Sequence, residues 1–475
     1  MKTRFNKLIT LGLVAMLAAF TTGCSDDDDT PTNVNNDMGN GAMVRVIHAS
    51  PDAPAVDIYA EGVTKPLVTN VAYGTTTAYL NIAPGTYNIQ LRAAGSDPTS
   101  QPAYETGDLA IPKGAKITAV AMGLISSADA ADQFRVIPYV ENFSAPGAGN
   151  AAVRIIHASA DAPTVALDVG NDGTTEISNF GRFDDSGEAG VPLPAGVELQ
   201  IAVWAGSPLQ RVTVFTTPQL PEGIELFVIA TGLLSELPRD ADGFSLLAVG
   251  PGGTIGFIKQ NPVVFALHGS PDAPAVDIFA GGAELVDNLA FGQLSGAVQV
   301  PPGSYDLDFR VHDNGAVAAT KATPVLSAGE RYLAVASGFV GGGTPAFELL
   351  PYDESFVVSG GDARVRVIHA SPDAPRVDVG TVAGNVLTPI PAFTDLGFKD
   401  ASSGGGQSLP AAVLSVGVAQ TGTTLPVATF GITTSPGLRA YAVAAGSLSG
   451  TGETFRLILV DTSVFPWAAA EVLPD

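Results

Sequence analysis

Apolar and polar residues alternate in short runs along most of the chain, a pattern that predicts β-strands. In the stretch 87–92, Tyr87, Ile89 and Leu91 share one face and Asn88, Gln90 and Arg92 share the other. This period of two is typical of a half-buried antiparallel strand. Further strands of the first 140 residues are expected at the β-branched or aromatic runs bounded by Gly, Pro, Asn and Asp, namely 43–48, 56–60, 77–82, 86–93, 116–122 and 134–139. Beyond the N-terminal segment, no stretch keeps a 3.6-residue period over three turns, so we expect an all-β body.

One string of residues occurs four times and divides the chain. Its first copy is Val46-Ile47-His48-Ala49-Ser50-Pro51-Asp52-Ala53-Pro54, and the histidines of the four copies stand at positions 48, 157, 268 and 369. The resulting spacing of about 100 to 110 residues is too long for a solenoid repeat and suits a small independent domain. The sequence therefore indicates a tandem array of one module.

Other landmarks recur in the same order within each copy. An apolar strand ends in Gly123, Gly232, Gly338 or Gly446, and a closing strand begins at a Phe about ten residues later. Short strands with turn residues about every ten positions predict four tandem β-sandwich domains of immunoglobulin-like or transthyretin-like type, arranged as a rod. The alternative is an eight-bladed propeller with two blades per copy. The expected divisions are a signal segment at 1–23, an acidic tether at 24–41, and repeats 1 to 4 at 42–149, 150–258, 259–359 and 360–475.

The N-terminus predicts export. Lys2, Arg4 and Lys7 precede an apolar run at 8–20 that is too short to span a bilayer, as in a secretion signal. The segment that ends in Gly23-Cys24 resembles a bacterial lipoprotein lipobox, although Thr21 stands where that family usually has Leu. A cleaved secretory peptide with a free thiol is the alternative.

The lipoprotein resemblance implies a lipid anchor on Cys24, the single cysteine of the chain. It also implies an outer-membrane location, because Ser25 follows the cysteine instead of the Asp that retains such proteins in the inner membrane. An acyl anchor of this kind holds a soluble body at a membrane. We therefore expect an exported protein that contacts the membrane through its anchor.

Charge narrows the range of partners. The formal net charge is −24, and removal of the three basic residues of the signal segment makes it −27. Nucleic acid is not expected as a partner, because phosphate contacts require clusters of Lys and Arg. With one cysteine no internal disulfide can form, so packed cores must provide the stability.

The repeated string also carries the residues best suited to chemistry. Four of the five histidines stand in it, each followed by one or two aspartates. His and carboxylates that converge can bind a divalent metal or perform acid–base catalysis. Alternatively, Ser-Pro-Asp forms a turn in which side-chain oxygens accept backbone N–H bonds, and the histidine bonds across the corner. The candidate ligand or metal corners are His48, Asp52 and Asp57; His157 and Asp161; His268, Asp272 and Asp277; and His369, Asp373 and Asp378.

The string running from Arg45 to Asp57, and again from Arg366 to Asp378, resembles the signature of the domain of unknown function 4397 family, which occurs on bacterial and archaeal surface proteins. With the downstream landmarks, the resemblance covers nearly the whole mature chain. Repeats 2 and 3 depart from it: Ala160 replaces Pro and the acid moves to Asp168, and Leu267 and Gly269 replace Ile and Ala. The resemblance implies no established activity.

The sequence thus favours a non-enzymatic, lipid-anchored protein of the cell envelope whose modules serve binding, adhesion or spacing. The expected partners are the membrane and an envelope polymer or surface protein. No catalytic residue, cofactor or resident metal is predicted, because the motifs for a serine nucleophile, a phosphate loop and a zinc protease are missing from the sequence. The rival hypothesis is a metal-dependent enzyme or metal-binding protein that uses the repeated corners.

Overall fold

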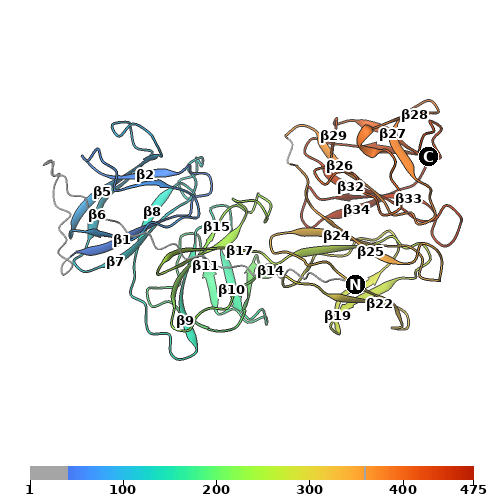
Figure 1. Cartoon of the computed structure of the whole chain (residues 1–475). Helices are drawn as coiled ribbons and strands as arrows, with labels where there is room; N and C mark the ends of the chain where they lie inside the picture. The colour runs from blue at the N-terminus through green and yellow to red at the C-terminus, as the bar shows by residue number, and fades with distance from the viewer. Residues whose placement is uncertain (1–40, 358–359) are drawn as a thin grey trace, which may run out of the picture.

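The computed structural model describes residues 41–357 and 360–475, and this part of the chain is all-β (Figure 1). Its one helical element is the short 3₁₀ turn η1 at Pro391–Phe393. The predicted signal segment, Cys24 and all of the tether except Gly41 lie outside the described residues.

The strands follow one order in every repeat. Repeat 1 contains β1 (Ala42–His48), β2 (Val56–Ala60), β3 (Val68–Val71), β4 (Leu80–Ile82), β5 (Gly85–Ala93), β6 (Tyr104–Ile111), β7 (Lys116–Met122) and β8 (Arg135–Val140). Repeat 2 contains β9 (Asn150–His157), β10 (Val165–Val169), β11 (Ile177–Phe180), β12 (Val191–Pro194), β13 (Gln200–Ala205), β14 (Gln210–Thr216), β15 (Glu225–Thr231), β16 (Ser245–Gly250) and β17 (Gly253–Lys259).

The second half of the chain repeats this order. Repeat 3 contains β18 (Val263–His268), β19 (Val276–Ala280), β20 (Ala283–Leu289), β21 (Val298–Gln299), β22 (Asp306–Val311), β23 (Val317–Ala322), β24 (Arg331–Ser337) and β25 (Glu348–Asp353). Repeat 4 contains β26 (Ala363–His369), β27 (Val377–Ala383), β28 (Val386–Pro389), β29 (Gln407–Leu409), β30 (Val413–Gln420), β31 (Ala428–Thr433), β32 (Arg439–Ala445), β33 (Arg456–Asp461) and β34 (Ala468–Val472).

Each repeat forms two small sheets that pack as a sandwich. In repeat 1 the strand orders are β4-β1-β7-β8 and β3-β2-β5-β6, and the other repeats use the same order, with β17 and β34 as added fifth strands in repeats 2 and 4. β1 runs parallel to β7, with Val46 opposite Ala119, whereas its other neighbour β4 is antiparallel. Because each sheet takes strands from both halves of its repeat, the halves do not form separate blades, and the propeller alternative is wrong.

The strand predictions hold best where apolar residues are dense. The bounds predicted for β2 and β7 match the structure, whereas only Leu80–Ile82 of the predicted 77–82 is a strand. The prediction missed β3 and β6, the two edge strands of the second sheet, because both are short or largely exposed. The Gly-rich stretch 250–256 forms the turn of the β16–β17 hairpin and the start of β17.

The two central strands of the first sheet of each repeat are buried on both faces. In β1, Val44 and Val46 pack inside the repeat's own sandwich, whereas Ile47 packs against another repeat. Its parallel partner β7 shares this burial and, like other doubly covered strands, reads as a nearly continuous apolar run. Consecutive apolar residues in the repeated string therefore serve two different cores.

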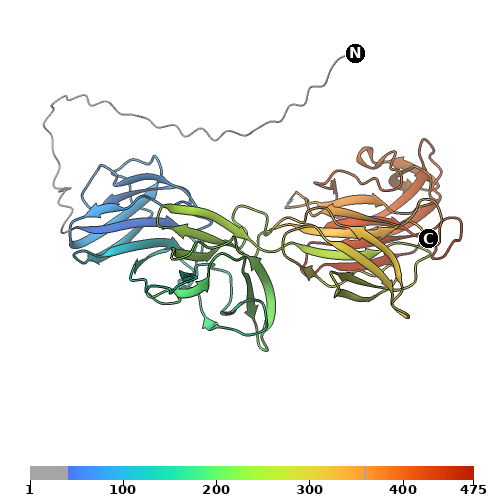
Figure 2. The ribbon, with the colours of Figure 1, turned by 60° about the horizontal axis from the view of Figure 1, so that its bottom comes forward.

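These outer faces join the repeats in pairs. Ile47, Val120 and Met122 of repeat 1 share one buried cluster with Ile156 and Phe227 of repeat 2. A second cluster joins repeats 3 and 4; its members include Phe265, Leu333, Val335, Ile368, Tyr441, Val443 and Trp467. Figure 2 shows the outcome as two lobes, repeats 1 and 2 in blue and green and repeats 3 and 4 in yellow to red. The expected rod of single modules is thus corrected to two pairs with shared cores.

Reciprocal polar contacts accompany the apolar ones within each pair. Arg45 of repeat 1 donates from Nη1 to the carbonyl oxygen of Gly250 at 2.6 Å, and Arg154 of repeat 2 donates to that of Val140 at 2.8 Å. Such exchange is the mark of an isologous interface. Repeat 3 has Phe265 at the corresponding position, and there the ring of Trp467 from repeat 4 stacks on it with centroids 4.4 Å apart.

The two lobes meet where β17 leads into β18. Gln299 Nε2 of repeat 3 donates to Thr213 Oγ1 of repeat 2 at 3.1 Å, and the Thr213 hydroxyl donates to Gln260 Oε1 at 2.8 Å. Arg239 of repeat 2 also donates to the carbonyl oxygen of Phe356 at 3.1 Å. Both polar side chains and backbone therefore connect the lobes.

Candidate functional site

Each corner histidine is buried and bonded to the backbone of its own loop. Its Nε2 lies 3.0–3.1 Å from the carbonyl oxygen of the proline six residues later. The pairs are His48 with Pro54, His157 with Pro163, His268 with Pro274, and His369 with Pro375. The histidine side chains are between 0% and 3% exposed. The strand end places the ring on the inner face, so the imidazole closes one end of the sandwich.

Burial keeps these imidazoles neutral. It lowers the pKa of all four histidines below 6.5, against the opposing effect of the bond to the proline carbonyl. A neutral ring that donates from Nε2 leaves Nδ1 as an acceptor. In the described part of the chain Nδ1 has no hydrogen-bond partner in any of the four. An enclosed, neutral imidazole of this kind has no access to a substrate outside the sandwich.

The corner serine holds the loop that follows the seventh strand. Ser50 Oγ donates to the carbonyl oxygen of Gly123 at 2.6 Å, and Ser159, Ser270 and Ser371 bond in the same way to Gly232, Gly338 and Gly446. Gly123 has a φ of 82°, and a Cβ there would lie 2.5 Å from the carbonyl oxygen of Gln133. The position therefore requires glycine, which accounts for the Gly landmark of the sequence.

The first aspartate of each corner caps the same loop. Asp52 accepts the backbone N–H groups of Ile125 and Ser126 at 3.0 and 2.8 Å. Asp161, Asp272 and Asp373 accept the corresponding pairs in the later repeats. At Asp373, burial opposes the shift, but hydrogen bonds from Ser449 and Ser447 lower the pKa to about 2. These carboxylates act as backbone acceptors.

The second aspartate lies on the second strand and accepts backbone N–H groups from other segments of its repeat. Asp57 accepts the N–H groups of Asn70 and Gly95 at 2.8 and 2.9 Å, and Asp378 accepts those of Asp395 and Gly422. In repeat 2, Asp168 accepts the N–H groups of Asp172 and Gly173. Compared with Asp57 on β2, Asp168 lies two residues further along its strand, and positions two apart lie on the same face of a strand. The histidine and the two aspartates of one corner thus bond to separate backbone segments and do not converge on one site.

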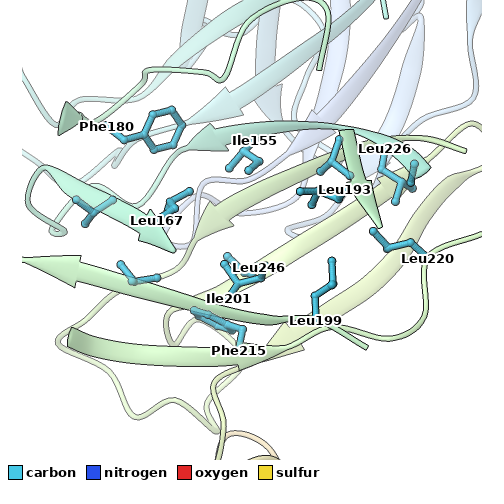
Figure 3. Packing of buried hydrophobic residues seen from close by; sticks show 14 of the residues in the cluster. Ile155, Leu167, Phe180, Leu193, Leu199, Ile201, Phe215, Leu220, Leu226 and Leu246 are labelled. Carbon is cyan, nitrogen blue, oxygen red and sulfur yellow. The ribbon is translucent and has the colours of Figure 1, made fainter. Parts of the chain in front are cut away.

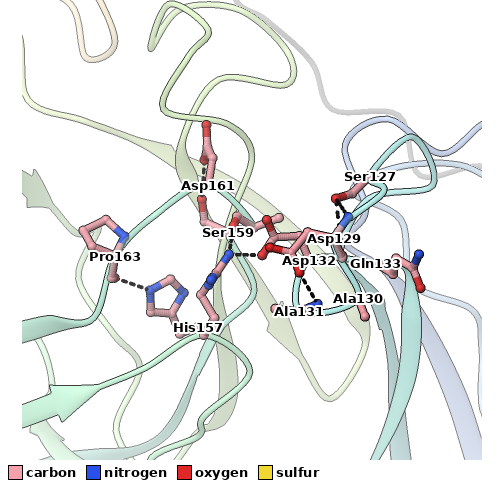
Figure 4. Close-up of polar contacts among 12 residues, drawn as sticks. Ser127, Asp129, Ala130, Ala131, Asp132, Gln133, His157, Ser159, Asp161 and Pro163 are labelled. Carbon is pink, nitrogen blue, oxygen red and sulfur yellow. Dashed lines mark hydrogen bonds and ion pairs between the residues drawn. The ribbon is translucent and has the colours of Figure 1, made fainter.

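The repeated residues therefore fit the alternative of a structural corner. Figure 4 shows the corner of repeat 2, with His157 facing Pro163 and Ser159 bonded to Asp161. The figure also labels Asp132, which belongs to repeat 1. Arg182 of repeat 2 pairs with Asp132 and also donates to the carbonyl oxygen of Ala160 at 2.6 Å. The corner thus also contacts the neighbouring repeat.

One group of three potential metal ligands converges among the described residues, and it lies away from the corners. Asp277, Asp287 and His312 of repeat 3 have ligand atoms within 4.8 Å of one another. His312 Nδ1 lies 2.7 Å from Asp277 Oδ1 and 3.4 Å from Asp287 Oδ1. The hydrogen bond to Asp277 raises the pKa of His312 above 6.5. Imidazole nitrogen and carboxylate oxygen are ligands that Zn²⁺ accepts. Asp277 is the one predicted corner residue in this group, and its partner is His312, not His268.

A cleft of about 360 Å³ lies between repeats 2 and 3. Apolar residues such as Val203 of repeat 2 and Phe465, which reaches the cleft from repeat 4, line it together with Arg211, Glu236 and Glu330. Burial raises the pKa of both glutamates, and the nearby Asp242 adds to the shift of Glu236, whereas Arg239 opposes that of Glu330. Shifted carboxyls in a cleft of mixed polarity are typical of ligand sites.

The sequence analysis missed His312, Glu236 and Glu330. His312 is the one histidine outside the repeated string, and that difference was an available signal. The two glutamates come from separate repeats and belong to no local motif, so only the packing of repeat 2 on repeat 3 brings them together. Cys24 lies outside the described residues, and none of the described helices is long and apolar enough for a membrane span.

Comparison with known proteins identifies the family. No curated protein matches the chain. One solved structure that aligns, the Bacillus anthracis TIE protein, has 10% identity over 86% of this chain and 68% of its own; its TM-score is 0.14, too low to support an argument about the fold. The sequence profile described as "Domain of unknown function (DUF4397)" matches residues 42–169 and 263–380, which is more than half of the chain. Each match begins at the first strand of one repeat and ends in the second strand of the next. The chain belongs to the DUF4397 family and carries its domain in tandem copies.

Proposed function

We propose that this chain is a non-enzymatic, lipid-anchored protein of the outer membrane, built from four tandem β-sandwich domains of immunoglobulin-like or transthyretin-like type that bind a component of the cell envelope. The eight small sheets, two in each repeat, support the sandwich part of this proposal. The positively charged and apolar N-terminal segment that ends at Cys24 supports export and anchoring.

The corner residues bond to the backbone of the protein itself, and this supports a non-enzymatic role. The corner histidines bond to proline carbonyls, and Asp52 and its counterparts bond to backbone N–H groups. These contacts leave the repeated residues without a shared open site, so a metal-dependent enzyme at the corners loses support. The corners are better explained as clamps that hold two loops at the same end of every sandwich.

The cleft between repeats 2 and 3 is the observation that carries the binding role. It combines an apolar wall with charged groups, and the two lobes are joined there by hydrogen bonds from Gln299 to Thr213 and from Arg239 to the backbone of Phe356. A preformed hollow between connected bodies can bind a partner without a large ordering cost. An envelope polymer with polar and apolar faces fits this chemistry.

Co-sedimentation with isolated peptidoglycan and with outer-membrane vesicles tests this role. We expect the purified protein to pellet with one of them, and Glu236→Ala to weaken binding about fivefold, as loss of one polar contact does. Glu198→Ala is the matched control, because Glu198 is exposed, lies in the same repeat and does not line the cleft. Failure of the protein to pellet with either material, or an equal effect of both variants, would overturn the proposal.

Incorporation of a labelled fatty acid tests the anchor separately. Cells that express the chain should transfer the label to the protein and retain it in the outer-membrane fraction, whereas Cys24→Ser should abolish both. An unlabelled protein that is released into the soluble fraction would favour the simple secretory alternative.

A second candidate function is divalent cation binding by Asp277, Asp287 and His312. The convergence of their ligand atoms within 4.8 Å favours it. Metal analysis of the wild-type protein beside His312→Gln tests it, and the protein in which all four corner histidines are changed to Gln tests the corners. Metal lost in the first variant supports this group; metal lost only in the second would restore the corners as sites.

A further inference from the structure

The interior of the repeat 2 sandwich contains a large space. It measures about 310 Å³. The corresponding space in repeat 3, between the strands that carry His268 and Phe309, measures about 50 Å³. The two repeats share strand order and corner contacts, so the difference arises from the side chains that fill the sandwich.

Apolar side chains from both sheets form the wall of this cavity. Leu193, Leu226 and Leu246 come from the first sheet and Ile201 and Phe215 from the second. Figure 3 shows these residues pointing between the two layers of strands. The polar side chains of the wall are few: His157, Thr217 and Gln219. Thr217 Oγ1 is already engaged, because it accepts the N–H of Leu199 at 3.1 Å.

The size and polarity of the cavity favour an apolar ligand over water. An apolar cavity of about 150 Å³ stays dry and binds benzene, and ligand pockets begin at about 300 Å³. A buried water needs at least two polar partners, which most of this wall does not offer. An unfilled space of this size would also forfeit contacts that its lining could make.

The cavity approaches the surface beside the added strand β17. Pro218, Ala248, Ile255 and Ile258 line both the cavity and a hollow of about 320 Å³ on the outside. Ile255 is 59% exposed, so the barrier between interior and solvent is made of a few side chains. A ligand end can therefore protrude while its apolar part lies inside.

The outer hollow offers a cation to that protruding end. Lys259 is the one charged residue that lines it, beside the hydroxyl-bearing Thr216. Lys259 Nζ donates to the carbonyl oxygen of Asp240 at 2.6 Å, which restrains the side chain, and the nearby carboxylates of Asp240 and Asp242 favour its charged form. In a chain whose net charge is −24, a single lysine at the mouth favours an anionic head group there over other faces of the molecule.

We propose that the repeat 2 cavity binds the acyl chain of a fatty acid, with the carboxylate beside Lys259 at the mouth. The apolar wall takes the chain, and the ammonium takes the charge that must stay outside. The cavity shares wall residues such as Val203 and Phe244 with the cleft proposed for envelope binding. Ala230 and Lys259 do not line the cleft and Glu236 does not line the cavity, so variants at these positions let either proposal fail alone.

Calorimetric titration of the purified full chain with laurate is the test. We expect one saturable site in the wild-type protein, and Ala230→Leu, which fills the cavity, to weaken binding at least about tenfold. The Tm of this variant should stay equal or rise, because the added methyl groups occupy empty space. Absence of saturable binding in the wild type, or unchanged binding in a folded Ala230→Leu variant, would overturn the proposal.

A substitution outside the hydrophobic core tests the contact between Lys259 and the carboxylate head group. Lys259→Gln should weaken laurate binding about tenfold and leave decanol binding unchanged, whereas Lys113→Gln makes the same charge change at an exposed site in repeat 1 and should affect neither. Equal losses of laurate in both lysine variants would show that net charge, not the mouth, attracts the ligand. That result would overturn the assignment of Lys259.

Discussion

Repeat 3 contains two histidines whose environments are opposite. His268 is 1% exposed and bonds to the carbonyl oxygen of Pro274, and burial lowers its pKa. His312 stands on the surface between Asp277 and Asp287, and the bond to Asp277 raises its pKa. The environment of the repeated histidine therefore favours the neutral ring inside the core, and that of the unrepeated one favours the protonated ring at the surface.

This contrast shows how repetition is to be interpreted in this chain. A residue that every copy needs for folding recurs in every copy, as His48, His157, His268 and His369 do. A residue that acts in one copy has no counterpart, and His312, Lys259 at the mouth of the cavity and Glu236 in the cleft are of this kind. The recurring string thus points to the fold, and chemistry is better sought in the differences between copies.

Removal of a corner histidine should have the largest effect on stability and is the most severe test of the contrast between the two histidines. His268→Ala leaves a cavity and an unpaired proline carbonyl, and should lower the free energy of unfolding by about 3 kcal/mol. Urea denaturation followed by the fluorescence of Trp467 measures it, because Trp467 lies in the core that repeats 3 and 4 share.

His312→Ala is the control for this measurement. It removes an exposed side chain whose pair with Asp277 at the surface contributes little, so the urea midpoint should fall far less than in His268→Ala. Similar midpoint losses in the two variants would contradict the division into a structural and a solvent-exposed histidine.

A smaller effect is expected at the corner carboxylate. Asp272→Ala removes the acceptor of the Val340 and Gly341 N–H groups, and should cost about 1.5 kcal/mol, since water can replace part of what is lost. Asp287→Ala, an exposed aspartate of the same repeat, should have no effect on the urea midpoint. If Asp272→Ala were equally silent, the loop after β24 would not depend on its cap.

A structural feature could be predicted from the sequence when it depends on residues that are close together in the chain or repeated along it. Strands such as β2 and β7 and the Ser-Pro-Asp corner depend on residues close in the chain or repeated along it, so the pattern predicted them. The pairing of repeats depends on contacts such as Ile47 with Phe227 and Phe265 with Trp467, which link positions some 180 to 200 residues apart. The cavity of repeat 2 depends on how side-chain volumes sum across two sheets, which no local pattern encodes.

The pH dependence of stability sharpens the comparison further. The pKa of His268 lies below its ordinary 6.5 in the folded state, so its contribution to stability is complete above pH 6.5 and is lost as the pH falls, because the unfolded chain then binds the proton. The loss approaches about 1.4 kcal/mol per pH unit for one histidine until the folded pKa is reached. His268→Gln should show a shallower decline between pH 6.5 and 5.5. An identical slope would mean that this imidazole is not held neutral.

The smallest expected effect is a shift of imidazole NMR resonances on binding of Zn²⁺, which is measured without unfolding the protein. His312 has a pKa raised by Asp277, so its stabilising contribution is present below pH 6.5 and is lost as the pH rises through the folded pKa. A metal competes with the proton for the same nitrogen. Zinc titration followed by imidazole NMR should therefore shift the His312 resonances and lower the apparent pKa of that ring, leave those of His268 in place, and fail in Asp287→Ala. Resonances of His268 that moved with zinc would return the metal hypothesis to the repeated corner, because only an opening of the sandwich would give the ion access to Nδ1.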